Sequence, residues 1–228
     1  MQTEKPYWLT EAYQNPINLT DTGIVLRNLR LSRIVTSLLV LFFDHKKEFV
    51  DYAGGFGLFT RLMRDKGFDF YWTDPFTKNE LARGFESAPD KKYHVATSFE
   101  SFEHFENPSD ELQKIVAIAD NIILSTELLP QPIPRIHDWW YYAPEHGQHI
   151  AFYTKVAFQK LAEKNKKFYY NLDNVHLLTE RKLSWLAELL LKFKYAKHLL
   201  FTLSFPCSLL LKSKTFDDAD ELKAKAAP

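Results

Sequence analysis

The feature of this sequence that most limits its fold is a glycine-rich turn between an apolar run and a helical pattern. The apolar run covers residues 49–52, and Gly54, Gly55 and Gly57 follow it directly. Residues 58–66 then have the spacing of a helix, and a second apolar run covers 68–73. A strand, a turn, a helix and a second strand in this order form a βαβ unit, which belongs in a parallel sheet.

The rest of the chain continues this alternation. A further strand near 82–86 is weakly marked, and the pattern predicts one doubly wound α/β domain at 48–213. We expect an N-terminal helical cap at 1–47, and a charged tail at 214–228 that is either a frayed helix or disordered. Helical patterns cover 27–43, 109–117, 150–163 and 180–195, and strand patterns cover 94–99, 121–125, 168–172 (extendable to 178) and 209–212.

Composition and charge exclude several classes of protein. Lys and Arg (29) balance Asp and Glu (29), which argues against a dedicated nucleic-acid binder. The single cysteine, Cys207, excludes a disulfide framework and a multi-cysteine zinc site. The longest apolar runs, 34–43 and 199–211, are too short or too interrupted to span a membrane, and residues 1–10 are no signal peptide. We therefore expect a cytoplasmic protein without a nucleic-acid or membrane partner.

The residues around the turn indicate which ligand it binds. A dinucleotide site needs G-x-G-x-x-G, but Thr60 stands where the third glycine belongs. Asp51, directly before the turn, suits a ligand with positive charge, such as the amino and sulfonium groups of S-adenosylmethionine (SAM). Asp74, at the end of the second strand, is placed to accept hydrogen bonds from ribose hydroxyls. The alternatives are a glycine turn without a ligand and a nicotinamide-binding Rossmann protein.

At this point the sequence resembles the class I SAM-dependent methyltransferases. Residues 50–57 (VDYAGGFG) resemble their first motif, except that Ala53 stands where a glycine is usual. Residues 98–105, 139–142 and 147–150 resemble the branch that is similar to ubiquinone-pathway and sugar methyltransferases. The resemblance implies SAM as cofactor and a mostly parallel, seven-stranded Rossmann-like sheet with a reversed last strand. The cofactor-binding residues that it implies are Asp51, Ala53, Gly54, Gly55, Gly57, Asp74 and Phe99.

Three residues are candidates for catalysis. An oxygen or nitrogen acceptor must lose a proton, and histidine is the commonest general base. His104 follows Glu103 after a predicted strand, and in similar enzymes a Glu-His pair lies beside the methyl-transfer centre. His149 is the next candidate; the alternatives for both histidines are local capping and packing. His146 and His149 are spaced like metal ligands, but no known spacing supplies a third ligand, so we expect no metal.

Aromatic and basic residues are candidates for the acceptor pocket. Trp139, Trp140 and Tyr141 form a dense cluster, which is typical of a pocket that excludes water, or else of an aromatic core or an oligomer interface. We also expect His146 to contact the substrate, and Arg27 to bind an anionic acceptor group, unless it belongs to a surface arm.

The sequence therefore predicts a SAM-dependent methyltransferase acting on a small polar acceptor, with a sugar or glycan hydroxyl as the leading candidate. Methylation of nitrogen or carbon on the same scaffold is the nearest alternative. The other is a non-catalytic cofactor-binding or partner subunit with this fold.

Overall fold

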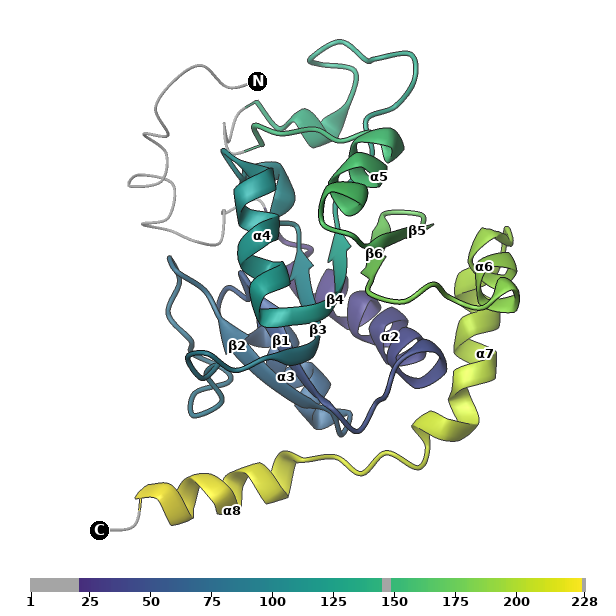
Figure 1. Cartoon of the computed structure of the whole chain (residues 1–228). Helices are drawn as coiled ribbons and strands as arrows, with labels where there is room; N and C mark the ends of the chain where they lie inside the picture. Colours follow the sequence, from purple (N-terminus) through teal and green to yellow (C-terminus); the bar gives the residue numbers. More distant parts are fainter. Residues whose placement is uncertain (1–20, 145–148, 227–228) are drawn as a thin grey trace.

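The structure of the protein is a computed structural model that describes residues 21–144 and 149–226 (Figure 1). Its strands are β1 (Glu48–Tyr52), β2 (Asp69–Thr73), β3 (Tyr93–Phe99), β4 (Ala119–Ser125), β5 (Phe168–Leu172) and β6 (Val175–Thr179). Its α-helices are α2 (Ile24–Phe42), α3 (Leu58–Asp65), α4 (Pro108–Ile118), α5 (Lys155–Lys164), α6 (Trp185–Lys192), α7 (Ala196–Ser208) and α8 (Thr215–Ala226). The short 3₁₀ helices η2 (Phe102–His104) and η3 (Trp140–Tyr142) complete the described elements.

The six strands form one mixed sheet in the order β2-β1-β3-β4-β6-β5. β1 pairs in parallel with β2 and β3, and β3 pairs in parallel with β4. β6 is antiparallel to both of its neighbours, and it forms a hairpin with β5 around Asp173 and Asn174. The strand order reverses between β1 and β3, and such a switch point is where ligands bind in open α/β sheets.

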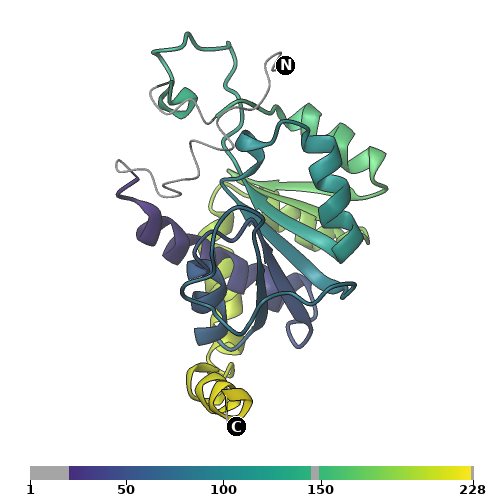
Figure 2. The same ribbon diagram turned by 90° about the vertical axis from the view of Figure 1, so that its left-hand side faces the viewer.

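Each face of the sheet carries its own apolar core. Adjacent residues of a strand point to opposite faces, so Phe49 joins one core and Val50 the other. The first core includes residues of α2, α3, α6 and α7, and the second includes residues of η2, α4 and α5. Figure 2 shows α4 and α5 on the opposite side of the sheet from α2. This three-layer arrangement confirms the predicted doubly wound, Rossmann-like α/β fold.

Side-chain caps define where three of the helices begin. Asn107 caps α4 and is followed by Pro108, whose fixed φ suits the first helical position. Thr154 caps α5, so this helix starts at Lys155 and not at residue 150 as predicted. Ser184 caps α6, which covers only Trp185–Lys192 of the single helix predicted at 180–195.

The prediction of seven strands is wrong for the described residues. The weakly marked third strand is reduced to an isolated bridge between Trp72 and Glu86 at the edge of the sheet. Residues 209–212 follow the end of α7 and are not a strand. The run that begins at Phe168 does not continue to 178 as one strand; Asp173 adopts a positive φ of 55°, which turns the chain into the β5–β6 hairpin.

The N-terminal helical cap is not confirmed as a separate element. α2 packs on the sheet through Leu31, Val35, Leu38 and Leu39, all buried in the first core. Fully burying a side chain of this size contributes about 1.5–3 kcal/mol, so this helix is part of the central sandwich. None of the described helices is long and apolar enough to cross a membrane.

The charged tail contains a helix that is docked on the domain. Asp218 of α8 is 3% exposed, and its carboxylate accepts hydrogen bonds from Arg64 Nη2 at 2.6 Å and from Arg61 Nη2 at 2.7 Å. The Leu222 side chain lies against Gly84, where a Cβ would be 2.3 Å from it. We call the Arg61–Arg64–Asp218 contact the α8 clasp.

Candidate active site

A cavity of about 2120 Å³ lies at the carboxyl ends of β1 to β4. Its lining comes from the segments that follow these strands, together with the first turns of α2 and parts of 140–149 and 173–174. Because the strands that meet there are parallel, their carboxyl ends meet at one edge of the sheet, which is where α/β proteins bind ligands. The fold therefore brings segments that are far apart in the sequence into one site.

The glycine turn forms one end of this cavity. A Cβ on Gly54 would lie 2.8 Å from both Asp51 Oδ2 and Trp72 Cδ1, so only glycine fits there. Gly55 has a φ of +53°, and a Cβ on it would meet nothing within 4 Å. Gly57 has a φ of +84° and precedes α3. Gly54 and Gly57 are thus required by packing and turn geometry, whereas Gly55 exposes backbone to open space that a ligand can enter.

Asp51 lies under the turn. Its Oδ1 accepts a hydrogen bond from Thr97 Oγ1 at 2.7 Å, and its Oδ2 accepts one from Thr60 Oγ1 at 3.4 Å. The side chain is almost fully buried, and no described residue gives it a cationic partner. This burial raises the pKa of Asp51 to about 7. Ala53 lines the cavity at a φ of 56°, the left-handed conformation that explains why glycine is usual at this position.

Asp74 connects the second strand to the glycine turn. Its Oδ2 accepts a hydrogen bond from the Gly55 amide at 2.9 Å, and its Oδ1 accepts bonds from the amides of Phe76 and Thr77, each at 2.8 Å. The carboxylate lines the cavity beside the open face of Gly55, as does the Phe99 ring. The residues of this end fit a cofactor with a positively charged portion and a ribose, as the sequence predicts.

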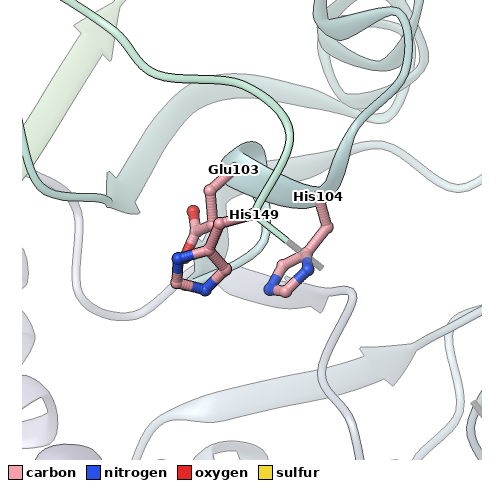
Figure 3. Close-up of side chains that lie close together, drawn as sticks. All are labelled: Glu103, His104 and His149. Atoms are coloured by element: carbon pink, nitrogen blue, oxygen red, sulfur yellow. The ribbon is translucent and has the colours of Figure 1, made fainter. Parts of the chain in front are cut away.

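His104 and His149 lie at the other part of the cavity (Figure 3). Their ring centroids are 5.0 Å apart and the rings are edge-on. His149 Nδ1 is 2.6 Å from the Tyr141 carbonyl oxygen. Because a carbonyl only accepts, Nδ1 carries the hydrogen, and a neutral His149 keeps the lone pair on Nε2. The structure therefore brings together the two histidines that the sequence singled out.

Glu103 contacts Tyr141, the residue that binds His149, and is not among the described residues that line the cavity. Its Oε1 accepts a hydrogen bond from the Tyr141 hydroxyl at 2.7 Å, and that hydroxyl also lies 3.0 Å from Thr126 Oγ1. Glu103 Oε2 is buried and has no hydrogen-bond partner among the described residues. Burial, reinforced by the charge of Glu100, raises the pKa of Glu103 to about 8. This shift favours the protonated form of the carboxyl group, whose contact with the pair runs through Tyr141.

Glu103, His104 and His149 are also the described residues that come closest to a metal site. One ligand atom from each lies within 4.8 Å of the others. Two of these groups already have other tasks, since Glu103 Oε1 binds Tyr141 and His149 Nδ1 binds a carbonyl. The metal group considered from the sequence included His146, which lies outside the described residues.

The predicted acceptor residues divide into two groups. Trp140 is 74% exposed and lines the cavity, as Tyr141 does. Trp139 packs on Tyr142 and Phe152, with ring centroids 4.9 and 5.7 Å apart. The aromatic cluster is thus partly a cavity wall and partly local packing that holds this wall.

Arg27 lines the cavity but already has an anionic partner. Its guanidinium donates to both carboxylate oxygens of Asp21, at 3.0 and 2.7 Å. An anionic acceptor group would have to compete with this pair.

Sequence reasoning missed several residues that line the cavity. Glu100 accepts a hydrogen bond from Ser125 Oγ at 2.6 Å and has a φ of 47°. Glu100 and Glu127 follow the ends of predicted strands, and this position could have indicated from the sequence that they line the site. No such signal exists for Asp173, Asn174 and Lys197, which the β5–β6 hairpin and α7 bring to the cavity.

Comparison with known proteins identifies the family. A protein-family model described as a methyltransferase domain matches residues 25–187, which is more than half of the chain. The chain belongs to this methyltransferase family. Membership confirms the predicted enzyme class, the SAM-dependent methyltransferases, and the class I fold. A search of curated proteins found no match to the sequence.

Solved structures share the fold at low sequence identity. An O-methyltransferase family protein from Burkholderia thailandensis is 14% identical, over 69% of this chain and 56% of that chain, with a TM-score of 0.52. A Haloferax volcanii complex of the Trm112 methyltransferase activator with a methyltransferase is 12% identical, over 74% and 80%, with a TM-score of 0.50.

Magnesium protoporphyrin IX methyltransferase from Synechocystis PCC 6803, with bound SAH, is 14% identical over 74% of this chain and 92% of that chain, with a TM-score of 0.48. A second structure of that enzyme holds SAM. The ubiquinone-pathway and sugar branch stays a prediction.

Proposed function

We propose that this methyltransferase transfers the methyl group of SAM to a hydroxyl of a small polar acceptor, with a sugar or glycan hydroxyl as the leading candidate. The observation that carries the proposal is that one cavity contains both the open Gly55–Asp74 edge and the His104–His149 pair. The first provides a place for the cofactor, and the second provides a group that can receive the acceptor's proton.

The residues at the cofactor end have separate tasks. When bound, SAM supplies an electrophilic methyl group on a sulfonium. The exposed Gly55 backbone gives the cofactor close access to the turn, and Asp74 presents carboxylate oxygens for ribose hydroxyls. Asp51 supplies the negative charge that a cationic ligand needs, and a bound cation would in turn favour its ionised form.

The residues at the other end hold and deprotonate the acceptor. His149 presents Nε2 as the hydrogen-bond acceptor because Tyr141 fixes its Nδ1 hydrogen. The acceptor hydroxyl gives its proton to this nitrogen, or to His104 beside it, as its oxygen is methylated. Glu103 keeps Tyr141 in place and is a positioning residue rather than a catalytic one.

The lining of the cavity favours an acceptor rich in hydroxyl groups. Glu100, Glu127, Asp173 and Asn174 offer oxygens that accept hydrogen bonds from hydroxyls. Trp140 offers an exposed aromatic face on which the apolar face of a sugar ring can pack. With about 2120 Å³, the cavity has more volume than the roughly 300–1,000 Å³ typical of a small-ligand site. There is space for a cofactor and an acceptor together.

Calorimetric titration with SAM and SAH tests the cofactor end. We expect binding to the wild type and none to Gly55→Val, since valine would fill the open space. Lys166→Val is the matched control because Lys166 has a similar φ of 55° and does not line the cavity. Retained binding by folded Gly55→Val would show that the site is elsewhere. A wild type that binds neither compound would favour the non-catalytic alternative.

Labelled methyl transfer to a panel of sugars and sugar nucleotides tests the reaction. Replacing the base should lower turnover by about 10²- to 10⁴-fold, so His149→Ala and His104→Ala are compared on the best acceptor. SAM affinity should stay nearly unchanged in both variants. His137→Ala, an exposed histidine that does not line the cavity, is the control. Full turnover in both variants would remove the histidines from the mechanism, and labelling of amines alone would favour N-methylation.

A further inference from the structure

The cavity carries a strong excess of negative charge. Among the described residues that line it, ten are Asp or Glu and four are Lys or Arg. The whole chain, in contrast, has 29 of each kind. Three of the four lining cations lie within 4 Å of a carboxylate that also lines the cavity. A cleft lined by one sign of charge raises the local concentration of ligands with the opposite sign, so this cavity favours ligands that carry a positive charge.

Two of these carboxylates, Glu100 and Glu127, lie in the cavity wall without a cation. Both are half-buried, and neither forms an ion pair with a described residue. Burial and the charge of Glu100 raise the pKa of Glu127 above its usual value. The charge of Lys197 acts in the opposite direction, but its Nζ already lies 2.9 Å from a carboxylate oxygen of Asp173. Glu100 and Glu127 therefore repel each other, and a cation between them would remove this repulsion.

One oxygen of the Glu100 carboxylate receives no short hydrogen bond from the described residues. Its Oε1 accepts a hydrogen bond from Ser125 Oγ at 2.6 Å, whereas its Oε2 lies 3.5 Å from the Tyr141 hydroxyl. That hydroxyl has one hydrogen, which it donates to Glu103 Oε1 at 2.7 Å. Glu100 Oε2 can therefore accept a hydrogen bond from a donor that enters the cavity.

Glu103 provides an independent sign that a donor belongs at this end of the cavity. Its side chain is fully buried, and its Oε2 has no hydrogen-bond partner among the described residues. One of its carboxylate oxygens lies within 4.8 Å of a ring nitrogen of both His104 and His149, which line the cavity, and Figure 3 shows the carboxylate beside His149. Because buried polar atoms are nearly always hydrogen-bonded, this oxygen indicates a polar or positively charged ligand group nearby.

The spacing of the carboxylates favours an organic cation over a metal ion. Glu100 and Glu127 belong to no group of three or more described His, Cys, Asp and Glu side chains that has the spacing of metal ligands. Mg²⁺ and Ca²⁺ take about six oxygen ligands or more, which two carboxylates cannot supply. An ammonium group has three N–H donors that point in different directions, as in lysine, so it can bind both carboxylates at once.

We propose that the acceptor is an amino sugar whose ammonium group binds between Glu100 and Glu127. The inference rests on the proposed function, because it names the class of sugar that the same site takes. An ammonium group has no lone pair, so it is bound and not methylated. The hydroxyl oxygen forms the new bond to the methyl carbon while the bond from this carbon to the sulfonium sulfur breaks. The sulfur keeps that electron pair as a neutral thioether, and the hydroxyl proton passes to His149 Nε2 or to His104.

Matched acceptors test the role of the positive charge. Labelled methyl transfer is measured for amino sugars with the amine at carbon 2, 3, 4 or 6, each beside its N-acetyl and hydroxyl counterparts. We expect the best amino sugar to exceed both of its counterparts by about 10- to 100-fold in kcat/KM, as expected for hydrogen bonds between charged groups. Mass spectrometry of the product should place the methyl group on oxygen.

Charge-removing variants test the two carboxylates. Glu127→Gln and Glu100→Gln keep the shape of the side chain, and each should lower the preference for the amino sugar over its hydroxyl counterpart by about 10-fold, chiefly through KM. Because the two carboxylates repel each other, neither variant should unfold at a lower temperature than the wild type. The control is Glu163→Gln, an exposed glutamate of α5 that does not line the cavity, which should keep the wild-type preference.

The outcomes separate this inference from the proposed function. Equal or faster transfer to the neutral counterparts would overturn the inference and leave the proposed function intact, whereas transfer to no sugar at all would overturn both. A methyl group on nitrogen would show that the amine is the nucleophile and is not bound as an ammonium. A preference that EDTA abolishes and Mg²⁺ restores would show that a metal ion binds the two carboxylates instead. A preference that both variants reduce, while Glu163→Gln retains it, supports the proposal.

Discussion

The active-site cavity and the α8 clasp both bury carboxylates, but they stabilise them in different ways. In the clasp, burial would raise the pKa of Asp218, yet the hydrogen bonds and charges of Arg64 and Arg61 lower it below its usual range. At the active site, the described residues give Asp51 and Glu103 hydroxyl partners and no cation, and burial raises their pKa values to about 7 and about 8. A buried carboxylate that is paired with arginines has a structural role. A buried carboxylate that lacks a cationic partner is instead a place where a bound ligand can supply the positive charge.

The cavity and the α8 clasp also differ in how many residues have a strained backbone conformation. Six described residues other than glycine have a positive φ, and four of them line the cavity. Such conformations cost about 1–3 kcal/mol each and persist where the surrounding structure holds them, often at functional sites. The clasp contains no described residue of this kind. The four in the cavity are Ala53, Glu100, Ala143 and Asp173.

The largest effect is expected in the clasp. Asp218→Ala leaves Arg64, whose side chain is 3% exposed, with only the more distant carboxylate of Asp69, 3.8 Å from its Nη1. Removing one partner of a buried ion pair costs about 3–5 kcal/mol, so denaturant unfolding should show a loss of that size. Asp217→Ala is the matched control, because its carboxylate is exposed one position earlier on the same helix. A loss under 1 kcal/mol would mean that the clasp does not hold α8, and that the two regions do not differ as described.

The next effect concerns a carboxylate of the cavity that is held by backbone donors. Asp74→Ala should weaken SAM binding by about 1.5–3 kcal/mol, the range for hydrogen bonds to a charged group. Because Asp74 also binds the Gly55 amide, part of the loss should come from a looser turn. Titration with an analogue that lacks the ribose hydroxyls separates the parts, since only the turn contribution remains. Equal losses for both ligands would assign Asp74 a purely structural role.

The sequence predicted the cavity better than the clasp, because the residues that meet in the cavity are closer together along the chain. The turn, Asp51 and Asp74 belong to one βαβ unit, so their proximity follows from local patterns that can be read directly. Glu103 and His104 could be placed because they follow a strand that ends at the same edge. His149 reaches them through a loop, and only the resemblance to a family pointed to it.

The clasp and the edges of the sheet depend on contacts that leave no local pattern. Arg64 and Asp218 are 154 residues apart, and nothing in the charged tail marks Asp218 as buried. The hairpin at 168–179 and α7 with its internal Pro206 were missed because apolar runs of this kind fit a strand or a helix equally well. The seventh strand failed because 82–86 makes only one bridge, which the resemblance could not reveal.

A smaller effect tests whether Glu103 is neutral. Its folded pKa of about 8 lies above its usual value of 4.5, so between these values only the unfolded state ionises, and stability falls as pH rises. Glu103→Gln cannot ionise and should escape this loss. Between pH 6 and 7 the wild type should lose up to about 1.4 kcal/mol relative to the variant.

Thermal unfolding across this range measures the difference, with Glu106→Gln, an exposed neighbour, as the control. Parallel pH curves for the wild type and Glu103→Gln would show that Glu103 is ionised. In that case a cation, such as a metal ion held with His104 and His149, would have to be sought.

The smallest effect concerns the strain at the glycine turn. Ala53 has a φ of 56°, and the left-handed conformation costs an L-residue roughly 1–2 kcal/mol that glycine does not incur. Ala53→Gly also gives the unfolded chain more freedom, which offsets about 0.4–1 kcal/mol of this gain. We therefore expect a net stabilisation of about 0.5–1 kcal/mol in denaturant unfolding, with SAM affinity unchanged. Ala82→Gly, a buried alanine beside the turn that is not among the residues with positive φ, should instead be destabilising. A loss of stability in both variants would show that the alanine methyl group stabilises the turn by more than its conformation costs, so the strain would not mark the site.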